Sequence, residues 1–420
     1  MRRPPSVTFV VMAGGKGERL WPLVRAAAPK VCLSPTGRRS LLQATIDRLR
    51  PAWPRASWLI VTTQGQAEAV RASVPPSLRR TVMVEPQIKN TAACITLAAV
   101  AQAIRDPQRV LVVAPADHWV NQVGVFQRAI RTAIRASVER DTIVTIGIRP
   151  THAHPGLGYL CAGSLLKGCG APRVFRLARF IEKPSRVQAR RLLKRPRTYW
   201  NSGIFVGTAD KFLECVTEWL PDHTRRLVPL AITASRSRDR QVALGSPAFT
   251  RRASEAYRAL EAVSFDHGVM DHVRGGLVVE GRFSWADLGS WDTWAHLCRS
   301  TSRTVALDSQ NITVVGQDGH LIVAIGVRDL LVVHTASATL ICRPDKAQEV
   351  REVVRRLSKD PRLAAYRRIS LREIQYLVKR KTHAGTRIGC RRPPDRGGAE
   401  RRVGAHRPAA DGAGAARGVR

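Results

Sequence analysis

The sequence lacks long apolar runs and closely spaced cysteine pairs. No apolar stretch approaches the ~20 residues that a membrane-spanning helix needs. The eight cysteines contain no CxxC pair, the usual mark of a zinc site or redox motif; they stand at 32, 94, 161, 169, 215, 298, 342 and 390. We therefore expect a cytoplasmic protein with no membrane partner, whose cysteines are small buried side chains in a reducing compartment.

Acidic residues and lysines are both scarce. There are 32 Asp and Glu against 69 Lys and Arg, and only 11 of the basic residues are lysines. An excess of positive charge suits nucleic-acid binding by counterion release, but the arginines are spread along the chain without a nucleic-acid-binding motif. We do not expect a nucleic-acid partner. Against this arginine bias, lysines at 16, 30 and 183 suggest sites that need a compact ammonium.

A glycine-rich loop follows the first expected strand. Residues 7–12, VTFVVM, are typical of a buried strand and run into AGGKGER at 13–19. Glycines allow positive φ and close approach to a ligand, and their N–H groups can hold an anion. The nearby cations are Lys16, Arg19 and Lys30. The spacing matches neither a Walker A loop nor GxGxxG, and we interpret the loop as a polyphosphate cradle.

Strand and helix patterns alternate through the first half of the chain. Apolar strands are expected at 58–62, 81–85, 110–114 and 142–148, and helices at 91–104 and 126–138. This order indicates an α/β fold with a mainly parallel sheet covered on both faces. Ligands of such sheets bind beyond the carboxyl ends of the strands, so other strand ends should carry the remaining chemistry.

Several motifs follow in order along the chain. EPQIKNTA (85–92) and PADH (115–118) end two strands, and later come GLGY (156–159), FIEKP (180–184), WNSG (200–203), SFDHGVMD (264–271) and WADLGSW (285–291). Taken alone, Asn90 or Thr91 could cap a helix, and Asp117 could be a turn or cap residue. Glu182 and Lys183 could be a solvated surface pair.

Together with AGGKGERLWPL and the downstream PK, these motifs resemble the sugar-nucleotide pyrophosphorylases. The Trp21-Pro22-Leu23 variant resembles the mannose-1-phosphate guanylyltransferase branch. The resemblance implies a Rossmann-like nucleotidyltransferase domain with a mixed, mainly parallel sheet, and a small C-terminal all-β, β-helix-like module. The wording at 264–271 departs from the family pattern at Phe265, His267, Gly268 and Asp271, which leaves open whether Asp266 touches substrate.

The resemblance also implies roles for individual residues. Arg19, Lys30 and Lys183 would be catalytic, Asp117 and Asp287 would hold Mg²⁺, and His118 would position its neighbours. The sugar would bind at Gly158, Glu182 and Asn201. The nucleotide would bind at Ala13, Gly14, Gly15, Lys16, Gly17, Glu85, Asn90 and Thr91.

The C-terminal part has a different character. Short alternating apolar stretches at 305–342 predict a small all-β module, in which no hexapeptide period is visible, and an amphipathic helix is expected at 348–357. We expect a nucleotidyltransferase domain at 1–300 and the β module with its helix at 301–360. The stretch 381–420 has ten basic and three acidic residues and little to bury, so we expect a disordered tail that is dispensable for catalysis.

The implied reaction joins GTP and α-D-mannose 1-phosphate into GDP-mannose and diphosphate, with Mg²⁺ assisting in-line attack on the α-phosphorus. We expect a monomer or homodimer. Two alternatives remain open: a sugar-1-phosphate nucleotidyltransferase with another base or sugar, and a catalytically decayed, basic nucleic-acid-binding protein on the same fold.

Overall fold

The computed structural model describes most of the chain up to the helix that follows the C-terminal strands. The described residues are 4–15, 17–24, 29–34, 39–166, 172–235, 247–297, 303–316, 320–363 and 366. Lys16 and the expected tail at 381–420 lie outside them.

A mixed nine-stranded sheet forms the main body, in the order β3-β2-β1-β4-β9-β6-β10-β8-β7. The pairs β1–β2, β2–β3, β1–β4 and β6–β10 are parallel, and β9 runs antiparallel to β4 and β6. The parallel expectation thus holds for the first half of the chain, while the later strands make the sheet mixed. The strands are β1 (Val7–Met12), β2 (Ser57–Thr63), β3 (Val82–Glu85), β4 (Val110–Pro115), β6 (Val144–Ile148), β7 (Tyr159–Leu165), β8 (Val174–Ile181), β9 (Thr198–Thr208) and β10 (Leu277–Gly281).

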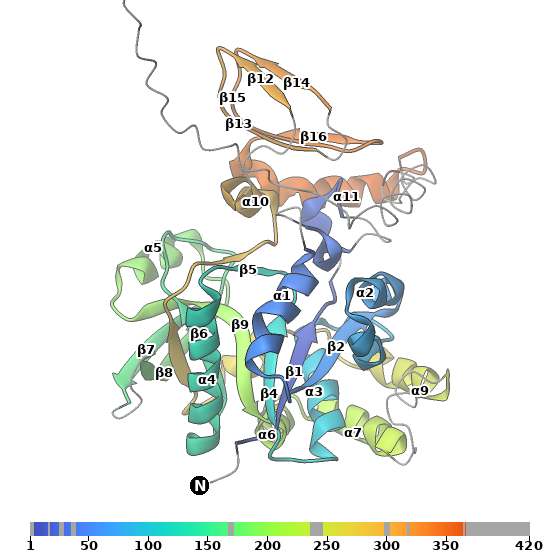
Figure 1. The fold of residues 1–420 in the computed structure, drawn as a ribbon, viewed down its shortest axis with the longest axis vertical. Coiled ribbons are helices and arrows are strands. Elements are labelled where there is room, and N and C mark those ends of the chain that lie inside the picture. Colours follow the sequence, from blue (N-terminus) through green and yellow to red (C-terminus); the bar gives the residue numbers. More distant parts are fainter. Residues whose placement is uncertain are drawn as a thin grey trace, which may run out of the picture.

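Helices cover both faces of this sheet because side chains of the inner strands alternate between two cores. Phe9 and Val11 point into one core with α1 and α4, and Val10 points into the other with α3 and α6. Both layers are visible in Figure 1. The helices are α1 (Leu41–Leu49), α2 (Ala67–Ser73), α3 (Asn90–Ala103), α4 (Val123–Arg140), α5 (Arg186–Lys194), α6 (Ala209–Trp219), α7 (Pro221–Ser235), α9 (Pro247–Arg258), α10 (Trp291–Leu297) and α11 (Val350–Lys359).

The strands after residue 303 form a separate small β module at one end of the molecule (Figure 1). Its strands are β12 (Thr304–Leu307), β13 (Gln310–Gly316), β14 (Ile322–Ile325), β15 (Arg328–His334) and β16 (Thr339–Cys342). β12 pairs in parallel with β14, and β13 with β15. In both pairs the partner residues are 18 positions apart, as are Asn311 and Asp329, whose side chains hydrogen-bond at 2.8 Å.

This constant 18-residue offset is the repeat of a β-helix, in which one turn stacks on the next. The sequence shows no hexapeptide pattern that predicts this repeat. Asn311 and Asp329 both have positive φ, at 55° and 54°, and occupy equivalent corners of successive turns. Their amide–carboxylate bond stacks one corner on the next. The repeat is therefore marked by corner residues more clearly than by apolar ones.

A third core joins the β module to the segment that follows the glycine loop. Leu20 and Trp21 pack there with Trp291 and Trp294, together with Leu331 of β15 and Val350 of α11. The buried indole of Trp291 donates a hydrogen bond from Nε1 to the carbonyl of Trp21 at 2.8 Å. The β module and its helix thus help to hold the chain just beyond the loop.

The cysteines of the described part are free thiols. Cys94 and Cys215 are buried, and Cys32, Cys161 and Cys342 are half-buried. Among the described residues, no helix has both the length and the apolar character needed to cross a membrane.

We predict that Trp291 couples the two parts of the molecule. Trp291→Phe leaves the buried carbonyl of Trp21 without its donor and should lower the free energy of unfolding by about 1–3 kcal/mol; Trp291→Ala should cost about 3–5 kcal/mol. Thermal melts of the purified variants measure both effects. The control is Trp219→Phe, because Trp219 is 39% exposed. A Trp291→Phe melt that coincides with the wild-type melt would show that this bond is not important for stability.

Candidate functional site

The glycine loop begins where β1 ends and is held by β2 and by the turn after β2. Ala13 is buried, donates its N–H to the carbonyl of Val61 at 2.7 Å and accepts from the hydroxyl of Thr62 at 3.0 Å. Beyond it, Gly15 and Gly17 have positive φ values of 114° and 59°, which favour glycine. The side chain of Gln66 donates to the carbonyl of Gly15 at 2.6 Å.

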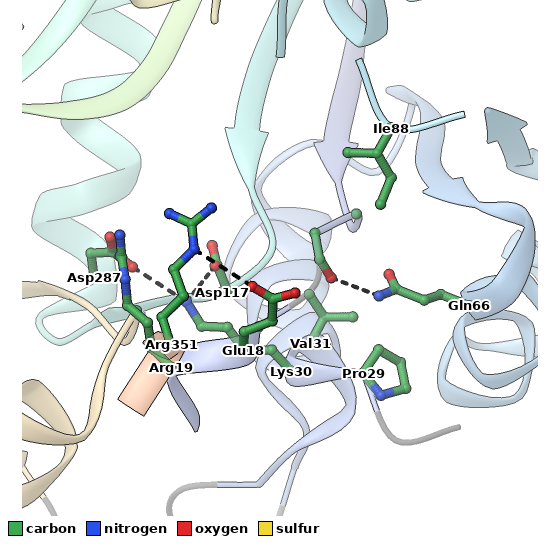
Figure 2. Close-up of a pocket in the computed structure, with 14 residues that line it drawn as sticks. Glu18, Arg19, Pro29, Lys30, Val31, Gln66, Ile88, Asp117, Asp287 and Arg351 are labelled. Carbon is green, nitrogen blue, oxygen red and sulfur yellow. Dashed lines mark hydrogen bonds and ion pairs between the residues drawn. The ribbon is translucent and has the colours of Figure 1, made fainter. Parts of the chain in front are cut away.

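The loop forms one wall of a pocket of about 440 Å³. Figure 2 shows charged side chains of both signs directed into it. Segments that are far apart in the sequence build the rest of the wall. The lining residues are Gly14, Gly15, Gly17, Glu18, Arg19, Pro29, Lys30, Val31, Gln66, Ile88, Asp117, Asp287, Gly289 and Arg351.

A buried lysine lies between two carboxylates in this pocket. The Nζ atom of Lys30 is 2.5 Å from Oδ2 of Asp117 and 3.4 Å from Oδ1 of Asp287. Burial alone would lower the pKa of Lys30, but the two carboxylates outweigh it and hold that pKa above its usual value. Burial opposes ionisation of Asp117 as well, but the charge of Lys30 keeps the Asp117 pKa below its usual value. Lys30 and Asp117 are therefore both charged at neutral pH.

A two-stranded ribbon brings the two aspartates together. β5 (His118–Val120) follows Asp117 directly, and β11 (Trp285–Asp287) pairs with it in antiparallel fashion, so that Asp287 lies opposite His118. The carboxylates were predicted as partners from sequence, and the ribbon is the element that joins them.

His118 lies beside Asp117 and contacts Trp285 of the opposite strand. Nε1 of Trp285 donates to Nδ1 of His118 at 3.3 Å, which assigns the imidazole proton to Nε2, on the side of Asp117. Burial lowers the pKa of His118, so the ring is neutral at pH 7. Its backbone carbonyl accepts a bond of 2.8 Å from the buried Arg48. This geometry suits the positioning role expected for His118.

The donor set fits a hard divalent cation. One ligand atom each from Asp117, His118 and Asp287 can be chosen so that all lie within 4.8 Å of one another. Each carboxylate uses one oxygen on Lys30 and has a second oxygen available for coordination. Oxygen ligands are those that Mg²⁺ prefers, whereas the assigned tautomer turns a proton of His118, not a lone pair, toward the aspartates.

The predicted sugar-binding residues Gly158, Glu182 and Asn201 form a second group together with Lys183 and Asp266, which we call the Glu182 cluster. Lys183 Nζ lies 2.7 Å from Oε1 of Glu182, and Asn201 Nδ2 donates to Asp266 at 2.6 Å. A Cβ atom at position 158 would come within 2.8 Å of Oε2 of Glu182, so glycine is required for this carboxylate to lie there.

Asp266 belongs to this cluster and not to the acidic pair. Its burial, and secondarily the charge of Glu182, raise the pKa of Asp266 to about 6. The cluster does not line the pocket among the described residues, but β9 connects the two. Gly203 donates its N–H to Oδ1 of Asn201 at 3.2 Å, and a Cβ at Gly203 would touch Pro115 and His118.

Three of the residues expected to bind the nucleotide, Glu85, Asn90 and Thr91, lie at the end of β3 and the start of α3. Thr91 accepts at its hydroxyl from the N–H of Phe265 at 2.8 Å, and the Asn90 carboxamide accepts from the N–H of Thr91 at 2.9 Å. Glu85 is only 6% exposed and accepts from the hydroxyl of Tyr257 at 3.0 Å. Burial raises the pKa of Glu85 to about 8. Neither Glu85 nor the Asn90–Thr91 pair is among the pocket-lining residues that the structure describes.

The structure adds pocket residues that sequence reasoning missed. Glu18 lies within the glycine-rich segment AGGKGER at 13–19, so its place in the motif could have predicted it. Gln66 contacts the loop through its side-chain amide, which donates to the backbone carbonyl of Gly15, and Arg351 comes from α11, far along the chain. No local pattern marks Gln66 or Arg351, because only the packing of β2 and of the C-terminal module brings them to the loop.

Comparison with known proteins divides the chain into the same two parts, the sheet domain and the β module. Residues 8–302 match the nucleotidyl transferase family, and residues 302–357 match a mannose-phosphate isomerase/GMP-like β-helix domain. A mannose-1-phosphate guanylyltransferase from Salmonella muenchen is 33% identical over 82% of this chain and 72% of its own length. The Escherichia coli K12 enzyme of that name is 32% identical over 84% of this chain and 74% of its own length.

A solved structure extends the likeness to the fold. A Thermus thermophilus protein described as a mannose-1-phosphate geranyltransferase is 30% identical, with a TM-score of 0.71, over 84% of this chain and 99% of its own. The matches cover both the sheet domain and the β module, which agrees with the resemblance inferred from the motifs. The chain belongs to the nucleotidyl transferase family, in the group of the mannose-1-phosphate guanylyltransferases.

Proposed function

We propose that the protein transfers GMP from GTP to α-D-mannose 1-phosphate, forming GDP-mannose and diphosphate. The observation that carries this proposal is the pocket in which a glycine loop faces Lys30 and the acidic pair Asp117–Asp287. Such a pocket offers backbone N–H groups and cations to phosphates and oxygens to a metal. The substrates come from the names of the relatives.

The chemistry that this site supports is an in-line displacement. A phosphate oxygen of the sugar phosphate attacks the α-phosphorus, the bond to the bridging oxygen breaks, and diphosphate leaves with that oxygen. No covalent intermediate with the enzyme is needed, so the protein contributes positioning and charge stabilisation. Mg²⁺ held by Asp117 and Asp287 would polarise the phosphates and neutralise developing charge.

The chain's own residues divide the remaining work. The glycine loop with Lys16 and Arg19 would bind the triphosphate. Lys30 holds the two carboxylates close together and would present its charge to a phosphate. Lys183 would bind the sugar phosphate, and Glu182 and Asn201 its hydroxyl groups. Asn90 and Thr91, at the start of α3, would contact the nucleotide base. Buried Glu85 would support this region through its hydrogen bond with Tyr257.

A substrate panel tests the proposed function directly. Diphosphate release is measured with each of the four NTPs and with mannose 1-phosphate, glucose 1-phosphate or no sugar phosphate. We expect turnover with GTP and mannose 1-phosphate to exceed that of every other pair. Preference for another pair would assign a different nucleotidyltransferase specificity. Salt-sensitive binding of duplex DNA without any turnover would favour the nucleic-acid-binding alternative.

We predict that either aspartate of the acidic pair is needed for turnover. Asp287→Asn and Asp117→Asn each remove a metal-binding charge and should lower kcat by ~10²-fold or more, about 3 kcal/mol of transition-state stabilisation. Lys30 keeps one carboxylate partner in each variant, so circular dichroism should report a folded protein. The control is Asp210→Asn, at an exposed position in α6. Near-normal turnover of Asp287→Asn would refute the assignment of Asp287 as a metal ligand.

We predict that Lys183 serves the sugar phosphate. Its side chain is 61% exposed and paired only with neighbouring Glu182 among the interactions described for it, so Lys183→Ala should leave stability unchanged. Loss of a charge-assisted bond to phosphate should raise the KM for mannose 1-phosphate about 10- to 100-fold and spare that for GTP. Lys194→Ala, an exposed lysine in α5, is the matched control. Equal effects on both Michaelis constants would refute this division of labour.

We predict a pH signature from Glu85. Its pKa is 4.5 in the absence of the fold and about 8 in the folded protein. The folded state therefore binds more protons than the unfolded state between these values, and this group's contribution to stability falls as pH rises from 4.5 to 8. Glu85→Gln keeps an acceptor for Tyr257 and should raise the thermal midpoint at pH 8–9 but not at pH 5.

The control for this comparison is Glu68→Gln, an exposed residue of α2. Melting curves of wild type and both variants are recorded at pH 5, 7 and 9. A difference between wild type and Glu85→Gln that stays constant across this range would mean that Glu85 does not titrate as its burial implies.

A further inference from the structure

One cation in the pocket comes from the C-terminal helix. Arg351 lies in the first turn of α11 and lines the same pocket as Lys30, Asp117 and Asp287. Figure 2 shows its guanidinium group beside Glu18 of the glycine loop. This residue has no assigned role in the site proposed above.

Packing fixes the position of Arg351 beside the loop. Its neighbour Val350 is 2% exposed, and Val354, one turn later, is 6% exposed; both belong to the third core with Leu20 and Trp21. Just before α11, Gln348 donates from its amide to the hydroxyl of Ser290 at 2.8 Å. The helix start is thus attached on one side to the residues after the glycine loop and on the other to the residues after Asp287.

The contacts of Arg351 contribute little to the stability of the fold, so they do not explain why an arginine stands at this position. A cation in the first turn of a helix opposes the helix dipole, which favours negative charge at that end. The Nε atom of Arg351 is 3.6 Å from Oε2 of Glu18, and the arginine side chain is 59% exposed. An exposed ion pair of this length contributes little to stability. The guanidinium can therefore leave Glu18 at little cost.

We propose that Arg351 is a phosphate-binding residue that contacts the β- and γ-phosphates of the nucleotide and then the departing diphosphate. The inference rests on the proposed function. A guanidinium presents paired N–H donors that match phosphate oxygens. Lys30 is held by the two carboxylates, whereas Arg351 is held only by Glu18 among its described contacts. Its place beside the loop, away from the Glu182 cluster, selects the diphosphate portion over the sugar phosphate.

A narrower role must be separated from this one. Arg351 could act only by neutralising Glu18, whose carboxylate would otherwise repel the triphosphate. The two roles differ in what happens when Glu18 loses its charge. If Arg351 binds phosphate, Glu18→Gln cannot restore an Arg351→Ala variant; if it acts only on Glu18, the double variant recovers.

The test measures steady-state kinetics and direct binding of inorganic diphosphate with Mg²⁺ by isothermal titration calorimetry. Arg351→Ala should raise both the KM for GTP and the Kd for diphosphate about 10- to 100-fold, the usual effect of losing a hydrogen bond to a charged group. The KM for mannose 1-phosphate should stay unchanged. Arg351→Lys should recover only part of the loss, because it keeps the charge without the paired donors.

Arg355→Ala is the matched control. Arg355 lies on the same helix with the same 59% exposure and pairs with Glu352 at 2.6 Å, and it does not line the pocket. Both constants should stay within about twofold of wild type in this variant, the scatter expected of a surface change. Wild-type values in Arg351→Ala, or their recovery in Arg351→Ala/Glu18→Gln, would overturn the inference. If the wild-type protein makes no GDP-mannose, the proposed function fails. The Kd for diphosphate in wild type and Arg351→Ala still tests whether Arg351 binds phosphate.

Discussion

The site depends on the contact of one buried ammonium group with two carboxylates. Without Lys30, Asp117 and Asp287 would face each other as like charges in a partly buried pocket, and their repulsion would be uncompensated. The Nζ atom of Lys30 lies 2.5 Å from Asp117 and 3.4 Å from Asp287. Its charge therefore holds two carboxylates from distant parts of the sequence close together in the absence of a ligand. The β5–β11 ribbon sets the spacing of the carboxylates, and the turn Lys30–Cys32 sets the position of the ammonium. Metal and phosphate chemistry can then be added to a site that is already assembled.

The β module is structurally part of this site. Its strands and α11 share a core with Leu20 and Trp21, the residues that follow the glycine loop, and with Trp291, which follows Asp287. Movement of the module would therefore disturb both walls of the pocket together. This arrangement gives a physical reason for a small β-helical unit to accompany a nucleotidyltransferase domain, and it is how Arg351 reaches the phosphates.

Much of the fold could be predicted because its signals are local. The strand at Val7–Met12 is predicted with its observed bounds, and the strand expected at 110–114, just before Asp117, is β4 at Val110–Pro115. The contacts of Lys30 with both carboxylates, of Glu85 with Tyr257 and of Arg351 with Glu18 could not be predicted. Each joins segments that only tertiary packing brings together. The 18-residue repeat was missed because its corners are marked by Asn311 and Asp329 rather than by a regular apolar period.

We propose that Asp117 and Asp287 jointly hold the metal that accompanies the nucleotide. Calorimetric titration of a non-hydrolysable GTP analogue, with Mn²⁺ and with the metal removed by chelator, tests it in wild type, Asp117→Asn and Asp287→Asn. Both substitutions should weaken binding of the metal–nucleotide complex about tenfold or more. Binding of the metal-free nucleotide should stay equal or become tighter, because a negative charge has been removed. Equal losses with and without metal, or no loss with metal in either variant, would contradict it.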